Sequence, residues 1–220
     1  MSNEKFPVSR RRFMEGTAAG AAVAAATTTG PAFAQSSDTL RVRNYSDIQI
    51  LDPAYILSAP ETDVNLCTMH GLVTLKSGDE WDWQLDAASE IDQVDETHIN
   101  FTMRDDIGWT NGFGEMTAHD VKFSYERVAD PEMASPYSED WIALDHVEVH
   151  DDRTGTIVLT EPYAPLWTTT MPSGRGMIVC KDAVEALDGK RYEAEPPAVS
   201  GPYEISKWSP SQRLTLSAIE

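Results

Sequence analysis

The chain has 220 residues, of which 41% are hydrophobic and 24% are charged, so it is long enough to bury the core of one domain or one and a half. Its 36 acidic and 17 basic residues give a formal net charge of -19, a field that repels a phosphate backbone and anionic membrane surfaces, so we expect no nucleic-acid partner. This acidity suits a protein kept soluble in saline surroundings, and equally one that attracts cationic solutes.

An export signal is predicted over residues 1–34. A basic start leads into an uncharged run rich in Ala, Gly and Thr, and the run ends in Ala-x-Ala at Ala34. The start resembles the twin-arginine export motif, which is carried here by Ser9, Arg10, Arg11, Phe13 and Met14. We therefore expect export by the twin-arginine machinery, cleavage at Ala34 and a periplasmic location. An N-terminal anchoring helix is the alternative.

The first elements after this signal are predicted from hydrophobic periodicity. Alternation of apolar and basic residues predicts a strand over residues 39–46. Residues 62–75 predict a helix that runs into the segment Gly-Leu-Val-Thr-Leu. Residues 97–104 alternate more regularly, with Ile99, Phe101 and Met103 on one side, and predict a half-buried strand.

The stretch 114–131 raises the question of catalysis, because His119 and Asp120 are adjacent and acidic residues lie nearby. A structural interpretation accounts for most of the same residues. Thr117 and Asp120 have the spacing of a capping box, and Asp130-Pro131 would end the helix. One helical stripe collects the apolar positions Ala118, Val121, Tyr125 and Val128. We therefore predict a capped helix and no enzyme, and keep a secreted hydrolase as an alternative.

Two strand pairs are predicted further along the chain. Residues 146–162 read as two strands around an Asp-Asp-Arg-Thr-Gly turn, and residues 200–220 contain the second pair. If residues 146–150 form a strand, His146, Glu148 and His150 share one face and could bind a metal. A solvated polar face explains the same pattern, so we assign no metal site and expect no cofactor.

Cys67 and Cys180 leave two possibilities open. An exported protein can oxidise its two cysteines to a disulfide that closes a long loop. Two independent buried thiols are the alternative, because the sequence does not bring their Cα atoms within bonding range.

Five landmarks now appear in a characteristic order. They are "LDPAY" (51–55), "MHGLVTL" (69–75), "INFTMRDDIGWTNGFGEMTAHDVKFSYERVADP" (99–131), "VEVHDDRTGTIVLTEPYAPL" (147–166) and "SGPYEISKW" (200–208). Their order and spacing resemble the family 5 solute-binding proteins of ABC importers, which include oligopeptide, dipeptide and nickel receptors. Two departures are Met103, where a Leu is usual before the Arg, and "AVSGPY" in place of Gly-Thr-Gly-Pro-Tyr.

The resemblance implies a mixed α/β fold of the type II periplasmic-binding-protein kind. It implies that residues 35–68 and 197–220 are part of lobe I and that residues 69–196 are a subdomain of this first lobe. Because members of the family continue past this point, the chain is expected to be an N-terminal fragment without the second lobe.

The implied function is capture of peptides or similar small solutes between two lobes, followed by delivery to an ABC permease with a cytoplasmic ATPase. The full-length protein is expected to be a monomer. Ligand-binding candidates are Tyr55, Trp141 and Arg175, the last because an Arg in a Gly-rich loop can pair with a ligand carboxylate. A receptor of the same fold for a metal chelate, of the nickel type, is the alternative.

Overall fold

The computed structural model describes residues 38–78 and 81–219. The predicted signal motif and cleavage site, at residues 9–14 and 34, lie outside the described residues. The chain separates into two compact units, residues 1–43 and 44–220, and the second contains all of the helices and strands discussed below.

The strand predicted over residues 39–46 is wrong. The described residues of this segment are in an irregular conformation, and the side chains of Leu40 and Val42 are 87% and 72% exposed. An alternating pattern forms a strand only where a neighbouring strand satisfies its backbone hydrogen bonds, and residues 38–46 pair with no strand among the described residues.

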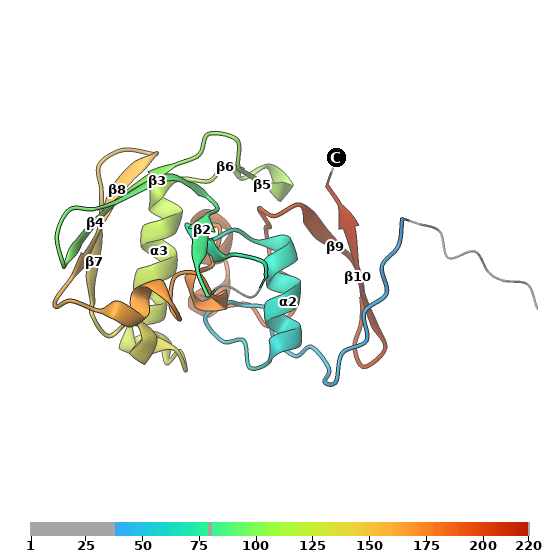
Figure 1. The fold of residues 1–220 in the computed structure, drawn as a ribbon. Helices are drawn as coiled ribbons and strands as arrows, with labels where there is room; N and C mark the ends of the chain where they lie inside the picture. The colour runs from blue at the N-terminus through green and yellow to red at the C-terminus, as the bar shows by residue number, and fades with distance from the viewer. Residues whose placement is uncertain (1–37, 79–80, 220) are drawn as a thin grey trace, which may run out of the picture. The chain divides into compact units, whose positions relative to one another are not determined.

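The second unit is built from antiparallel strands with helices packed against them (Figure 1). A four-stranded sheet has the order β3-β4-β8-β7, and three two-stranded ribbons pair β1 with β2, β5 with β6, and β9 with β10. The strands are β1 Val73–Leu75, β2 Trp83–Leu85, β3 Ala88–Gln93, β4 His98–Met103, β5 Gly108–Trp109, β6 Gly114–Glu115, β7 Leu144–Val149, β8 Thr154–Leu159, β9 Tyr203–Ser209 and β10 Arg213–Ala218. The α-helices are α2 Ala59–Thr68, α3 Ala118–Ala129 and α4 Lys181–Glu185.

Helix α2 begins and ends earlier than predicted. Ser58 is its N-cap, a proline lies in its first turn, and Glu61 accepts from the Ser58 backbone N–H at 2.9 Å, which fixes the start at Ala59. The helix ends at Thr68, and residues 73–75 form strand β1 instead of continuing the helix. The predicted helix over 62–75 is therefore correct only in its first half.

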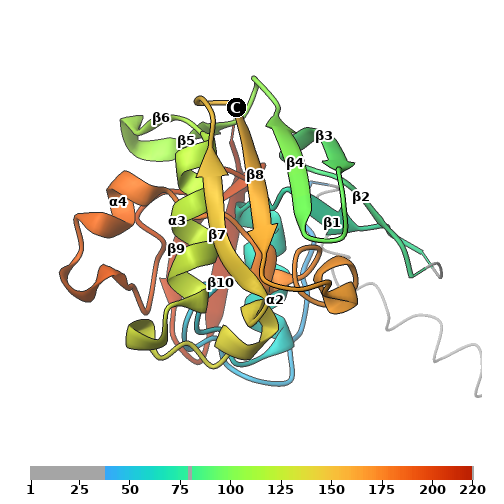
Figure 2. The same cartoon turned by 90° about the vertical axis from the view of Figure 1, so that its left-hand side faces the viewer.

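Helix α3 confirms the prediction for residues 117–130. The Thr117–Asp120 capping box is formed, and the Asp120 carboxylate accepts from the Thr117 N–H at 2.8 Å. The predicted apolar stripe is buried, and α3 packs against strand β7 (Figure 2). Helix α3 thus covers one face of the four-stranded sheet.

The strand predictions in the remaining chain are also confirmed. Strand β4 buries Ile99, Phe101 and Met103, and β7–β8 and β9–β10 are both antiparallel pairs. Gly155 of β8 makes room for the core, because a Cβ at this position would lie 2.6 Å from an atom of the Phe101 ring.

Two apolar clusters fill the interior. The larger lies between the four-stranded sheet and α3, where the rings of Tyr125 and Trp141 are 4.2 Å apart between centroids. The smaller joins Leu51, Val64 and Tyr192 to the ribbon β9–β10. In the described part of the chain, no helix combines the length and the apolar character that a membrane span needs.

Candidate functional site

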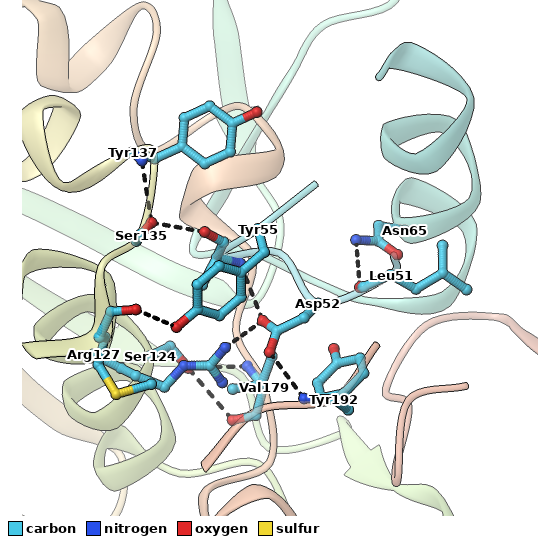
Figure 3. A network of polar contacts seen from close by, with 12 residues as sticks. Leu51, Asp52, Tyr55, Asn65, Ser124, Arg127, Ser135, Tyr137, Val179 and Tyr192 are labelled. Carbon is cyan, nitrogen blue, oxygen red and sulfur yellow. Dashed lines mark hydrogen bonds and ion pairs between the residues drawn. The ribbon is translucent and has the colours of Figure 1, made fainter. Parts of the chain in front are cut away.

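The segment of residues 49–58 contributes side chains to both core clusters. Its own Asp52 fixes it to the rest of the protein. This side chain is fully buried, and it accepts from the N–H groups of Ala54, at 3.1 Å, and Tyr192, at 3.3 Å. It is also paired with the guanidinium of Arg127 on α3 (Figure 3). Burial raises the pKa of Asp52, while Arg127 and the two N–H groups oppose the rise. Asp52 therefore connects this segment to α3 and to the distant residue Tyr192.

A second buried carboxylate, that of Glu61, holds the same segment at both ends. Its Oε1 accepts from the N–H groups of Gln49, at 2.9 Å, and Ile50, at 3.2 Å. Its Oε2 accepts from the N–H groups of Leu57, at 2.6 Å, and Ser58, at 2.9 Å. One side chain thus satisfies four backbone donors, and closes the segment into a loop of defined shape.

Hydrogen bonds to the turn after α3 hold the middle of this loop. The hydroxyl of Tyr55 donates to the carbonyl of Met133 at 2.7 Å, and the hydroxyl of Ser135 donates to the carbonyl of Ala54 at 2.7 Å. Ala134 lies between them with a left-handed backbone, φ 48°. Figure 3 shows these contacts on the opposite side of the loop from Tyr192. These contacts tie the middle of the loop to the turn after α3.

An open depression of about 340 Å³ lies over the loop. Its apolar lining consists of Ile50, Leu57 and Pro136, and its polar lining of Gln49, Tyr55, Arg191 and Glu193. Of the three predicted ligand residues, Tyr55 is the one that lines it, although only 7% of this residue is exposed.

Sequence reasoning missed the other residues of the depression. Arg191 and Glu193 are far from Tyr55 in the chain, and no local motif marks them. They reach the depression because the Leu51 N–H donates to the Glu193 carbonyl at 3.0 Å, and because the Tyr192 N–H donates to Asp52. The guanidinium carbon of Arg191 lies 4.4 Å from the centroid of the Tyr55 ring.

The other two predicted ligand residues, Trp141 and Arg175, are not in the lining of the depression. Trp141 is 1% exposed, and its indole N–H donates to the carbonyl of Arg175 at 3.2 Å. Arg175 contacts Asp140 through Nε at 2.8 Å, in an ion pair whose geometry falls short of a hydrogen bond. Its guanidinium also lies 4.6 Å from the ring centroid of Tyr137, whose hydroxyl donates to the carbonyl of Ile56. Trp141 and Arg175 thus contact the loop indirectly: Trp141 bonds to Arg175, Arg175 lies against Tyr137, and Tyr137 bonds to Ile56.

A second depression, of about 470 Å³, lies beside α3 and β7. Four of its polar lining groups are paired with one another. Lys122 contacts Glu126 at 2.6 Å, and His146 contacts Asp145 at 2.7 Å. The depression at Tyr55 is the better candidate site, because the Arg191 guanidinium in its lining keeps donors that no described residue engages.

The pair His119–Asp120 has the structural role that the capping box predicts. The Asp120 carboxylate accepts from the N–H of Lys181 at 2.8 Å and from the indole N–H of Trp109 at 3.3 Å, so it joins α3 to α4 and to β5. His119 is exposed, and its Nε2 lies 3.8 Å from the carboxylate of Asp152. Asp120 and His119 therefore have separate partners: Asp120 caps α3, and the His119 ring lies near Asp152.

Residues 146–150 keep their polar groups on the surface. His150 Nε2 lies 4.0 Å from Glu148, while Val147 between these polar residues is buried. Within residues 38–78 and 81–219, no group of three or more His, Cys, Asp or Glu side chains is placed to hold a metal ion.

Cys67 and Cys180 are separate thiols in this structure. Burial raises the pKa of both, to about 11 for Cys180 at the start of α4.

Comparison with known proteins gives a consistent result. The family model of the bacterial extracellular solute-binding proteins, family 5 (middle region), matches residues 83–220. The periplasmic oligopeptide-binding protein OppA of Salmonella typhimurium is 31% identical, in an alignment that covers 91% of this chain and 40% of that protein. The probable D,D-dipeptide-binding periplasmic protein DdpA of Escherichia coli is 27% identical, over 81% of this chain and 35% of the relative.

Solved structures of binding proteins share the fold of this chain. The binding protein MoaA of A. tumefaciens R10, in complex with mannopinic acid, is 27% identical with a TM-score of 0.71, over 78% of this chain and 35% of that one. NikZ of Campylobacter jejuni, in complex with Ni(L-His), is 25% identical with a TM-score of 0.67, over 79% and 34%. The chain spans 35–40% of the length of these first relatives. With a family model matched over more than half of its length, this chain belongs to family 5 of the bacterial extracellular solute-binding proteins.

Proposed function

We propose that the chain takes part in capturing a peptide or a similar small solute for an ABC importer, and that the depression over Tyr55 forms part of the binding surface. In this proposal a second lobe closes over the solute, and the closed protein delivers it to a membrane permease with a cytoplasmic ATPase. Because a solute that contacts both lobes binds the closed state more tightly, it shifts the hinge equilibrium toward closure.

The observation that carries the proposal is the rigid loop in a protein of a solute-binding family. Asp52 and Glu61 hold the backbone of residues 49–58, so little conformational freedom is lost when a solute binds there. The exposed side chain of Leu57 offers apolar surface, while Gln49 and Arg191 offer donors. A mixed lining of this kind suits a solute with both backbone-like polar groups and apolar groups.

The relatives support a peptide or a small polar solute. Two of them are named for oligopeptides and for D,D-dipeptides, and one structural neighbour holds mannopinic acid. We further propose that Tyr55 contacts the solute directly, while Trp141 and Arg175 maintain the loop through Tyr137.

Export belongs to the same proposal. A receptor that feeds an importer works on the outer side of the membrane, and the sequence of residues 1–34 resembles a twin-arginine signal. We propose that the protein is cleaved at Ala34 and acts as a periplasmic monomer.

A metal chelate is a second candidate solute, because NikZ in complex with Ni(L-His) shares the fold and is 25% identical. A chelated metal carries its own ligands, so it needs few ligating side chains from the protein.

Thermal unfolding of the intact protein against a panel of tripeptides and Ni(L-His) tests the proposal. A solute at a hundred times its Kd is expected to stabilise the fold by about 2.7 kcal/mol. Tyr55→Ala should weaken that binding, and the matched control Tyr45→Ala should not, because Tyr45 is exposed and lies outside the depression.

Tyr55 is largely buried, so Tyr55→Phe serves as a second variant that keeps the ring and its packing. A panel in which no peptide, carboxylate or chelate shifts the unfolding temperature would overturn the proposal. Solute binding that survives Tyr55→Ala unchanged would overturn the choice of site.

A further inference from the structure

Residues 191–193 approach the depression as an extended segment with alternating sides. Arg191 has φ -149° and ψ 149°, and the next residues are tied to the loop by the Tyr192 N–H to Asp52 and by the Glu193 carbonyl to the Leu51 N–H. Successive side chains of an extended chain point in opposite directions. Tyr192 is accordingly buried in the smaller core cluster, while Arg191 and Glu193 line the depression.

The guanidinium of Arg191 lies against the Tyr55 ring, and most of its N–H donors have no partner among the described residues. Its carbon lies 4.4 Å from the centroid of the Tyr55 ring, which orients its plane. Nη2 lies 3.5 Å from the Glu193 carboxylate, and both side chains of this pair are solvent-exposed. An exposed pair of this length contributes little stability, and a guanidinium has five N–H donors. Arg191 can therefore exchange Glu193 for another carboxylate at small cost.

The charge of the chain makes this residue selective. A net charge of -19 disfavours the approach of an anionic solute, so a solute carboxylate needs a local cation to bind. Among the described residues that line the depression, Arg191 is the one basic residue. Arg175, the sequence-based candidate for such a role, is already engaged by Asp140 and by the Thr169 carbonyl.

We propose that Arg191 is a specificity-determining residue, and that it anchors a carboxylate group of the captured solute through paired N–H donors while stacked on Tyr55. The inference rests on the proposed function and deepens it, because it assigns the solute to the class of carboxylates. A guanidinium matches a carboxylate in shape as well as in charge, so it binds the acid more tightly than the corresponding amide. The carboxylate can come from a peptide C-terminus or from a sugar-acid type of solute.

Calorimetric titration of the intact protein tests the inference with three probes: Ala-Ala-Ala, its C-terminal amide, and gluconate as a carboxylate without a peptide. We expect at least one of the two acids to bind, and the amide to bind at least about tenfold more weakly than the tripeptide if the tripeptide is the one bound. Arg191→Gln should weaken acid binding by at least about tenfold, and so remove the preference over the amide. Arg191→Lys keeps the charge but loses the paired N–H donors of the guanidinium, so its affinity for the acid should lie between those of the wild type and Arg191→Gln.

Arg213→Gln is the matched control, because Arg213 is exposed on β10 and lies outside the depression. It removes the same charge and should leave acid binding unchanged. Unfolding temperatures of all variants are measured to check that each variant keeps the fold. If Arg191→Gln alters the unfolding temperature, the comparison rests on Arg191→Lys.

The outcomes separate the two proposals. Acid binding that Arg191→Gln and Arg213→Gln weaken equally overturns the inference, since long-range charge then explains it. A protein that binds neither acid, but does bind an uncharged solute or Ni(L-His) from the wider panel, overturns the inference and leaves the solute-binding function standing. A protein that binds nothing in the wider panel overturns both.

Discussion

Arg127 on α3 and Asp52 in the loop before α2 form an ion pair in which the side chains are 3% and 0% exposed. Asp52→Ala removes one charge, strands the other in the interior and leaves the N–H groups of Ala54 and Tyr192 without their acceptor. We expect a loss of about 3–5 kcal/mol in the free energy of unfolding, measured by urea denaturation.

The exposed pair Arg104–Asp106 provides the matched control for this prediction. Asp106→Ala should cost no more than about 1 kcal/mol. Equal losses for the two aspartate variants would show that the buried pair has no special weight in the fold.

Glu61→Gln should open the loop of residues 49–58. A glutamine side chain offers one acceptor oxygen where the carboxylate offers two, so it leaves at least two of the four N–H groups of Gln49, Ile50, Leu57 and Ser58 unsatisfied. We expect a loss of about 2–3 kcal/mol in unfolding free energy, together with faster hydrogen exchange at Leu57. Glu90→Gln, at an exposed position of β3, should change stability by no more than about 0.5 kcal/mol. Protection of Leu57 that persists in Glu61→Gln would contradict the assigned role.

His119→Ala and Asp120→Ala should differ sharply in stability. His119 is exposed, so its removal should change the unfolding free energy by about 0.5 kcal/mol at most. Asp120→Ala removes the helix cap and the acceptor for Lys181 and Trp109, so it should cost about 2–3 kcal/mol. Solute binding should survive His119→Ala. A substrate turned over by the wild type and lost in this variant would restore the hydrolase alternative.

The raised pKa of Cys180 predicts that the folded protein loses stability at alkaline pH. Its thiol has a pKa of about 11 in the folded chain, where burial opposes the thiolate, against an ordinary value of 9.0. Below pH 9 both states keep the proton. Between pH 9 and about 11 the unfolded chain releases it first, so stability falls by up to about 1.4 kcal/mol per pH unit.

Thermal unfolding of the wild type and of Cys180→Ala from pH 8 to pH 11 measures this contribution. The variant should lose less stability across the range, whatever its stability at pH 8. Identical slopes would mean that the thiol does not titrate with the raised pKa in the folded chain.

The fold was predictable where a local signal and the tertiary packing agree. Helix α3 has an N-cap, an apolar stripe and a terminating Asp-Pro in its own sequence, and β4 alternates between buried residues and exposed or half-buried ones. The start of α2 carried a signal as well, in Ser58, Pro60 and Glu61, but the apolar periodicity from residue 62 onward drew the boundary too late. At residues 39–46 an alternating pattern had no partner strand to make it a β-strand.

The candidate site was predictable only in part. Tyr55 follows a recognisable Leu-Asp-Pro, whereas Arg191 and Glu193 carry no mark in their own neighbourhood. They are brought to Tyr55 by a carboxylate more than a hundred residues away in the chain, through one backbone N–H. Contacts of this range depend on the whole fold, so no window of sequence contains them.

The side chains of residues 191–193 alternate between the depression and the interior. This alternation affects how the lining of the depression can change. The turn before them contains Gly189 and Lys190, both with positive φ, so length changes there can be absorbed before the extended segment begins. A single residue inserted between Arg191 and Tyr192 would place its own side chain on the side of the depression and would turn Arg191 toward the interior, because Tyr192 stays anchored to Asp52. The polarity of the depression is therefore set by odd or even distance from Tyr192, so it could be reversed without replacing any of the residues that line it.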